Sequence, residues 1–132
     1  MTLAGCTISG GGGGSSPCET GSATDSSTVS FANDIQPLLA AKGCLTTGCH
    51  GAMLPSSGFV LTTYESMFAP GATARALELC PVVPGDAESS WLIEKVGPDP
   101  RSGERMPLLR PPLSEEELEL LATWIRDRAP NN

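Results

Sequence analysis

Cys44-Leu45-Thr46-Thr47-Gly48-Cys49-His50-Gly51 is the stretch around which the rest of the chain is organised. It places the only histidine of the sequence directly after one of five cysteines. Two thiols followed at once by an imidazole are typical of c-type haem attachment, in which each thiol adds to a vinyl group and the histidine binds the iron. The usual C-x-x-C-H spacing is widened here to C-x4-C-H, so we expect a bulged loop at Cys44–Cys49 with backbone freedom supplied by Gly48.

The same residues are open to other chemistry. A disulfide between Cys44 and Cys49 needs no cofactor, and two cysteines with a histidine also form half of a zinc site. A closed zinc site takes four ligands, so it would have to recruit Cys80 and a carboxylate, because the chain has no second histidine. The motif alone leaves these alternatives open.

Length and charge restrict the class of protein. The 132 residues suit one domain, and 15 acidic against 8 basic side chains give a net charge of -7. This charge argues against nucleic-acid binding and favours partners with a basic surface. No apolar run approaches the ~20 residues that a membrane-spanning helix requires.

The N-terminal residues indicate export. Leu3-Ala4-Gly5-Cys6 resembles the lipobox of bacterial lipoproteins, in which the cysteine is lipidated, although the preceding charged and apolar regions are absent and a chance match is the alternative. A Gly/Ser/Thr-rich segment follows. We therefore predict a truncated signal remnant and flexible tether over residues 1–28, a folded domain over 29–132, and an extracytoplasmic protein anchored to the membrane by lipid on Cys6.

Two helices, the first of them short, are expected to form the framework of a mainly α fold. Apolar residues at helical spacing predict a helix ending at Lys42-Gly43, and Pro37 places its regular start near Asp34, with Phe31 packing from the preceding chain. Ser114 and Glu117 form a capping box before a second apolar stripe that extends to Ile125. We expect these N- and C-terminal helices to pack together.

Shorter elements and long loops connect them. We expect one helical turn at 63–68, a short helix at 72–79, and a helix that Asp86 caps and Gly97 ends. Residues 97–112 are proline-rich and basic, which predicts a loop. Its Arg101, Arg105 and Arg110 are candidates to pair with a haem propionate, although a solvated basic loop is the more ordinary interpretation.

A second iron ligand is sought among the methionines, because the only histidine is already assigned. Met53 is too close to His50 in sequence to reach the opposite face of a porphyrin easily, and Met67 reads equally well as a core residue. Met106 lies in the proline-rich loop, where no apolar stripe accounts for it. We therefore expect Met106 to be the distal ligand, with Met67 as the next candidate.

Residues 29 to 130 resemble the small class I monohaem cytochrome c domains of exported bacterial proteins, of the planctomycete and myxobacterial type. The resemblance is carried by the following segments: Val29 to Phe31 with Asp34 to Leu39, Cys49-His50-Gly51, Gly58 to Leu61 with Tyr64-Glu65, Val83 to Ser90, Arg105-Met106-Pro107, and Leu113-Ser114 to Trp124-Ile125. It implies a small cytochrome c-like fold around one haem, with thioethers at Cys44 and Cys49, His50 as proximal ligand and Met106 as distal ligand. Cys18 and Cys80 have no place in this scheme, and either a disulfide or two unrelated thiols fits them.

These observations favour a single-electron carrier with one covalent haem c, which docks to basic redox partners and is not an enzyme. One alternative is a haem-based sensor or small-ligand binder with an open sixth position. The other is a non-haem exported interaction module with a disulfide or zinc at the cysteines.

Overall fold

The structure is a computed structural model that describes residues 18–22 and 27–132. Within these ranges it contains helices and loops and no strand, which confirms the predicted mainly α class. None of the helices in the described ranges is long and apolar enough to cross a membrane. The elements, in chain order, are the π-helical η1 (Phe31–Ile35), α1 (Gln36–Ala41), the 3-10 helices η2 (Ser56–Gly58) and η3 (Glu65–Phe68), α2 (Ala72–Ala76), α3 (Trp91–Val96) and α4 (Glu115–Arg126).

The first helical segment begins earlier than expected. The Ser30 side chain accepts a hydrogen bond from the Asn33 N–H at 3.0 Å, and the Asp34 carboxylate accepts one from the Ser30 N–H at 2.7 Å. This reciprocal cap starts η1 at Phe31, so the predicted start near Asp34 was wrong. Pro37 then occupies the first turn of α1, where its missing N–H costs nothing. The predicted end is confirmed, because Gly43 follows with a φ of 75°.

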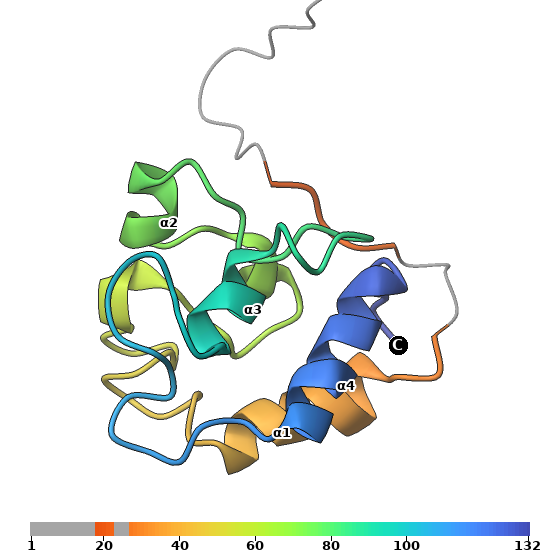
Figure 1. The fold of residues 1–132 in the computed structure, drawn as a ribbon, viewed down its shortest axis with the longest axis horizontal. Helices are drawn as coiled ribbons and strands as arrows, with labels where there is room; N and C mark the ends of the chain where they lie inside the picture. The colour runs from red at the N-terminus through yellow and green to blue at the C-terminus, as the bar shows by residue number, and fades with distance from the viewer. Residues whose placement is uncertain (1–17, 23–26) are drawn as a thin grey trace, which may run out of the picture.

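The capping box predicted for the last helix is present. The Ser114 hydroxyl accepts from the Glu117 N–H at 3.2 Å, and the Glu117 carboxylate accepts from the Ser114 N–H at 2.7 Å. Glu117 also pairs with Lys42 at 2.8 Å, which joins the end of the first helical segment to the start of α4. α4 packs against η1 and α3, and Figure 1 shows α1 and α4 along one side of the molecule.

An aromatic cluster forms the centre of the core between these helices. Trp124 of α4 is fully buried and its ring lies 5.6 Å from that of Phe31, which in turn meets Tyr64 edge-on at 5.3 Å. The polar atoms of both larger rings are satisfied, because the Trp124 indole donates to the Pro130 carbonyl at 3.0 Å and the Tyr64 hydroxyl donates to the Ala129 carbonyl at 2.7 Å. The aromatic rings at the centre of the helical side, formed by η1, α1 and α4, are therefore packed together, and their polar atoms are hydrogen-bonded.

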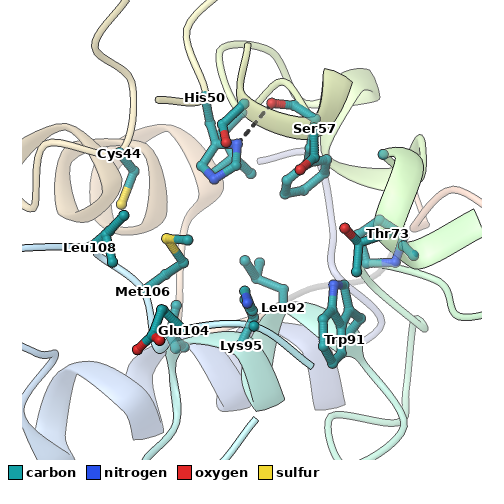
Figure 2. A pocket seen from close by; sticks show the side chains of 18 of the residues that line it. Cys44, His50, Ser57, Thr73, Trp91, Leu92, Lys95, Glu104, Met106 and Leu108 are labelled. Atoms are coloured by element: carbon teal, nitrogen blue, oxygen red, sulfur yellow. Dashed lines mark hydrogen bonds between the residues drawn. The ribbon is translucent and has the colours of Figure 1, made fainter. Parts of the chain in front are cut away.

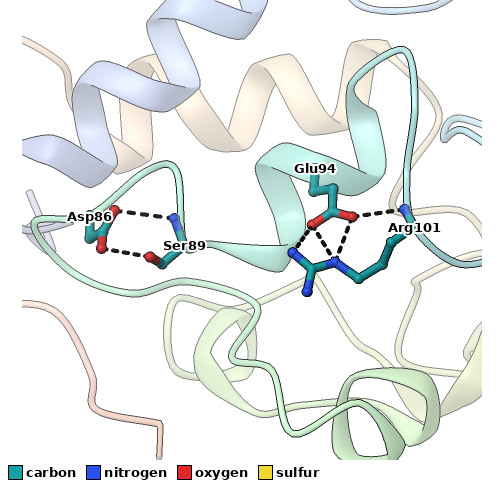
Figure 3. Close-up of polar contacts among 4 residues, drawn as sticks. All are labelled: Asp86, Ser89, Glu94 and Arg101. Atoms are coloured by element: carbon teal, nitrogen blue, oxygen red, sulfur yellow. Dashed lines mark hydrogen bonds and ion pairs between the residues drawn. The ribbon is translucent and has the colours of Figure 1, made fainter.

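The connecting elements follow the prediction in part. The expected turn at 63–68 is present as η3, whereas the helix expected at 72–79 stops at Ala76 because Glu78 turns into a left-handed conformation, with a φ of 56°. The helix expected after Asp86 begins only at Trp91, with Ser90 as its N-cap. The Asp86 carboxylate instead accepts two hydrogen bonds from Ser89, at 3.1 and 2.7 Å, and closes a turn before the helix (Figure 3).

Cys18 and Cys80 form a disulfide, which decides between the two readings that the sequence allowed. Next to it, the Ser22 N–H donates to the Arg128 carbonyl at 3.1 Å, and the Asn131 N–H donates to the Ser22 carbonyl at 3.3 Å. Residues 18–22 of the predicted tether thus contact the C-terminal end of the domain. The predicted lipidation site, Cys6, lies outside the described residues.

Candidate functional site

An apolar cavity of about 290 Å³ is lined by none of the side chains of the aromatic cluster. The end of α1, the 50–61 loop, α2, α3 and the 102–108 loop surround it. Figure 2 shows His50 reaching into this space from one side, with Met106 and Leu92 on the opposite side. The cavity therefore brings together side chains from three regions that are distant in the sequence.

The Cys44–Gly51 loop folds back on itself and absorbs the two additional residues of the motif. The His50 N–H donates to the Cys44 carbonyl at 3.0 Å, and the Cys49 N–H donates to the Thr46 carbonyl, also at 3.0 Å. Gly48 has a φ of 82°, so this position requires the backbone freedom that the sequence predicted. The loop is a closed, hydrogen-bonded unit.

Gly51 is required by close packing. A Cβ atom at this position would lie 2.7 Å from the Leu45 carbonyl oxygen and 3.0 Å from that of Thr46. Both neighbours are backbone atoms of the same loop and cannot move independently of it. The glycine after His50 thus allows the loop to close.

The imidazole of His50 is held with one nitrogen available. Its Nδ1 lies 2.9 Å from the Phe59 carbonyl oxygen, and the Phe59 ring packs edge-on against the imidazole, with the ring centroids 5.3 Å apart. Because a carbonyl only accepts hydrogen bonds, Nδ1 carries the proton and the Nε2 lone pair is free. A histidine fixed through one nitrogen by a carbonyl is the arrangement that metal-ligating histidines use.

Met106 is half-buried and lines the same cavity. Its N–H donates to the Lys95 carbonyl at 2.9 Å, which joins it to the last turn of α3. The neighbouring Arg105 guanidinium donates to the Val96 carbonyl at 3.1 Å. The loop that carries Met106 is therefore fixed on α3 by its backbone, although it has no regular structure of its own.

A second set of contacts fixes the beginning of this loop. Arg101 pairs with Glu94 of α3 at 2.8 Å, and its N–H also donates to the Glu94 carboxylate at 2.7 Å (Figure 3). The Lys95 ammonium donates to the Ser102 carbonyl at 2.8 Å. Consecutive residues of α3 thus hold consecutive residues of the loop.

The other two candidate methionines lie elsewhere. Met67 is completely buried in the hydrophobic core, as expected for a residue that fills space there. The side chain of Met53 is 71% exposed. Neither lines the cavity, so of the three internal methionines only Met106 is placed beside His50.

Both cysteines of the motif are free thiols near His50. Cys44 is buried and lines the main cavity, and together with Cys49 it also lines an adjoining cavity of about 80 Å³. Burial raises the pKa of the Cys44 thiol and Cys49 raises it further, whereas Arg110 and Lys42 lower it. The sulfurs are therefore at the cavity wall and not joined to each other.

The structure removes Cys80 as a ligand for the alternative zinc site. Cys80 is joined to Cys18 in a disulfide, so its thiolate cannot complete a site with Cys44, Cys49 and His50. Across residues 18–22 and 27–132 there is no group of three or more His, Cys, Asp and Glu side chains that could hold a metal ion. Besides the carboxylate of Glu104, the donor groups at the two cavities are thus one imidazole, one thioether and two thiols.

The sequence reasoning missed the polar residues of the cavity wall, among them Thr73, Trp91 and Lys95. Trp91 and Lys95 lie one helical turn apart on α3, where the spacing indicated only an amphipathic helix. Burial lowers the pKa of Lys95, with the charge of Glu104 acting in the opposite direction. The i to i+4 spacing could have shown that both face the same side, but not that this side borders a cavity.

No protein family model matches the chain, and no curated protein matches it. Among solved structures, a chain of Kuenenia stuttgartiensis hydrazine synthase is similar, with 24% sequence identity and a TM-score of 0.42. The match covers 80% of this chain and 17% of that chain, so this protein spans only a small part of the length of its structural neighbour. A likeness at this level says nothing about function.

Proposed function

We propose that this protein is a monohaem cytochrome c that carries single electrons. Cys44 and Cys49 would hold the haem through thioethers, His50 would bind the iron on one face, and Met106 would bind it on the other. When bound, the haem supplies a reversible one-electron change at its iron. No side chain of the protein needs to make or break a substrate bond.

The observation that carries the proposal is the convergence of His50, Met106 and Cys44 on one apolar cavity. These residues come from the motif loop and from a proline-rich loop more than fifty positions later, and no shared secondary structure requires them to meet. The residues present also fit a haem chemically, because the thiols are unpaired, the Nε2 of His50 is free and the cavity wall is mainly apolar.

The chain's own contribution is positioning and burial. The Phe59 carbonyl fixes the tautomer and direction of the His50 ring and makes it a better electron donor. The backbone bond from Met106 to Lys95 holds the thioether at the cavity, so little freedom is lost on ligation. Apolar residues such as Leu92 and Val96 exclude water, which together with methionine ligation favours a relatively high reduction potential.

The surroundings support an exported carrier. The Cys18–Cys80 disulfide suits an oxidising compartment, where c-type haem would also be attached. The net charge of -7 suits a redox partner with a basic surface and argues against nucleic acid. Lipid attachment at Cys6 stays part of the proposal for location.

The fixed position of Met106 favours a carrier over a sensor with an open sixth position. Replacing Met106 with alanine should convert the low-spin spectrum to high-spin and allow carbon monoxide to bind the reduced form. Met53→Ala is the matched control, because Met53 is 71% exposed and does not line the cavity.

Visible spectra of the two variants and of the unmodified protein decide this point. We expect low-spin spectra and no carbon monoxide binding for the unmodified protein and for Met53→Ala. Rapid binding of carbon monoxide by the unmodified protein would reject Met106 as ligand and leave the sensor as the better account.

A further inference from the structure

The cavity has two chemically different ends. Figure 2 shows the Cys44 sulfur at one end and the side chains of Thr73 and Trp91 at the other, with Lys95 beside Trp91. Cys44 provides a thiol, whereas Thr73, Trp91 and Lys95 provide a hydroxyl, an indole N–H and an ammonium. A ligand that fills the cavity would therefore meet sulfur at one edge and hydrogen-bond donors at the other.

The donors at this polar end have spare capacity. Within the described part of the chain, neither the Trp91 indole N–H nor the Thr73 hydroxyl has an acceptor, although the Trp91 side chain is only 7% exposed. The Lys95 ammonium uses one of its hydrogens, in the bond to the Ser102 carbonyl at 2.8 Å. No buried side-chain nitrogen or oxygen of the described residues lacks a partner, so these donors open onto the cavity space. A ligand that displaces the solvent there would have to accept hydrogen bonds in its place.

Lys95 makes no ion pair among the described residues, although the charge of Glu104 acts on it. Lys95 is half-buried and lies over the Trp91 ring, with its Nζ 5.6 Å from the ring centroid. No carboxylate of the described residues lies within ion-pairing distance of it, because the three ion pairs found there involve other residues. Glu104 also lines the cavity, but it is exposed and Figure 2 shows it beside Met106 and away from Thr73. A half-buried cation favours an anionic group as its neighbour.

The arginines suggested by the sequence are engaged elsewhere. Arg101 is paired with Glu94, and Arg105 donates to the Val96 carbonyl. Arg110 packs on Gly43 and lines the smaller cavity beside Cys49, at the thiol end. The basic loop therefore leaves the polar end of the cavity to α2 and α3.

We propose that Thr73, Trp91 and Lys95 bind the carboxylates of the haem propionates and so fix which way round the haem enters the cavity. The inference rests on the proposed function. Haem carries its vinyl groups and its propionates at opposite edges, and the two ends of the cavity match these groups in the same order. Charge-assisted hydrogen bonds from Lys95 and neutral ones from Trp91 and Thr73 would then hold the propionates while Cys44 and Cys49 meet the vinyl groups.

Resonance Raman spectra of the mature haem protein test the assignment, because the bending modes of the propionates respond to their hydrogen bonds. Trp91→Phe, Lys95→Met and Thr73→Val each remove a donor and keep the approximate shape of the side chain. Arg75→Met is the control, since Arg75 is an exposed cation of α2 that does not line the cavity. Covalent haem and the methionine-ligation band are measured on the same samples.

We expect a shift of at least one propionate bending band in the three donor variants, with no shift in Arg75→Met and with methionine ligation retained in all four. Unshifted bands in all three donor variants of a protein that carries haem would overturn this inference and leave the proposed function intact. A parent protein without covalent haem would overturn both.

Discussion

The two sides of this protein are built on different principles. On one side, η1 and α4 carry side-chain caps at their N-terminal ends, and buried side chains pack around Trp124. On the other, the Cys44–Gly51 loop closes by its own backbone hydrogen bonds. The loop that carries Met106 is joined to α3 by one backbone bond and by side-chain contacts, and apolar side chains of this region line a cavity.

Because the two sides differ in this way, residues that determine stability can be distinguished from residues that determine the properties of the cavity. Truncating a side chain in the packed helical side should lower the protein's free energy of unfolding, because each buried side chain there contacts others and its removal leaves a cavity. A cavity wall loses little of the protein's own packing when one side chain changes, and the effect falls on whatever occupies the cavity. Substitutions on the two sides should therefore separate stability from spectral properties.

Leu121→Ala should give the largest loss of stability. Leu121 is a fully buried residue of α4, so we expect the free energy of unfolding to fall by about 2–5 kcal/mol in urea denaturation. Leu108→Ala makes the same change at the cavity rim, where the side chain is 51% exposed, and should alter stability by less than about 0.5 kcal/mol. Equal losses of stability in the two variants would contradict the proposed difference between the helical side and the cavity side.

Gly51→Ala should break the motif loop. The added methyl group would meet the carbonyl oxygens of Leu45 and Thr46, and we expect a loss of about 1–3 kcal/mol together with reduced haem attachment, measured by the yield of haem-bearing mass. Gly48→Asn is the control, because open space surrounds this position and asparagine tolerates its positive φ. Full haem yield in Gly51→Ala would show that the loop does not need to close in this way.

Ser114→Ala should have a smaller effect, confined to the helical side. It removes the side-chain cap of α4 and should cost about 1 kcal/mol in thermal or urea unfolding, whereas Ser114→Asp retains an acceptor and should cost little. The visible spectrum should be the same for both variants. A changed spectrum would show that the start of α4 is coupled to the cavity.

Glu117→Gln should give the smallest effect, visible only through pH. The Lys42 ammonium, helped by the Ser114 N–H, holds the pKa of Glu117 below its ordinary value of 4.5. A carboxylate whose pKa is lowered by folding contributes stability above its unfolded pKa and loses that contribution as the pH falls through the folded value. Stability of the variant should therefore decline less steeply below pH 4.5, while glutamine retains the geometry of the capping box. If the stability of the variant and of the unmodified protein fell identically with decreasing pH, the Glu117 carboxylate would not contribute to stability in this way.

The helical side was the more predictable from sequence, because its signals are local. Ser114 and Glu117 lie three residues apart, and both partners of the capping box are visible in one turn of sequence. The sequence did not predict the start at Phe31, because Pro37 favours a later start, although Ser30 and Asp34 form the cap. Asp86 was predicted to cap a helix, but its carboxylate closes a turn with Ser89 and the helix begins later, after Ser90.

The cavity side required information that no single segment contains. The motif predicted that the chemistry would involve Cys44, Cys49 and His50, and the unexplained Met106 was placed beside them by the structure. Nothing in the spacing indicated that Phe59 would hold the imidazole or that Trp91 and Lys95 would line the same space. These contacts depend on how distant loops meet, as does the Cys18–Cys80 pairing across 62 residues.

The most direct test of the central claim is a reduced-minus-oxidised visible spectrum, combined with denatured mass, of the full chain coexpressed with a c-type haem maturation system. The account predicts a sharp alpha band and one covalently retained haem per chain, with Cys44 and Cys49 no longer available to thiol reagents. A colourless protein with the apoprotein mass and two free thiols would contradict it.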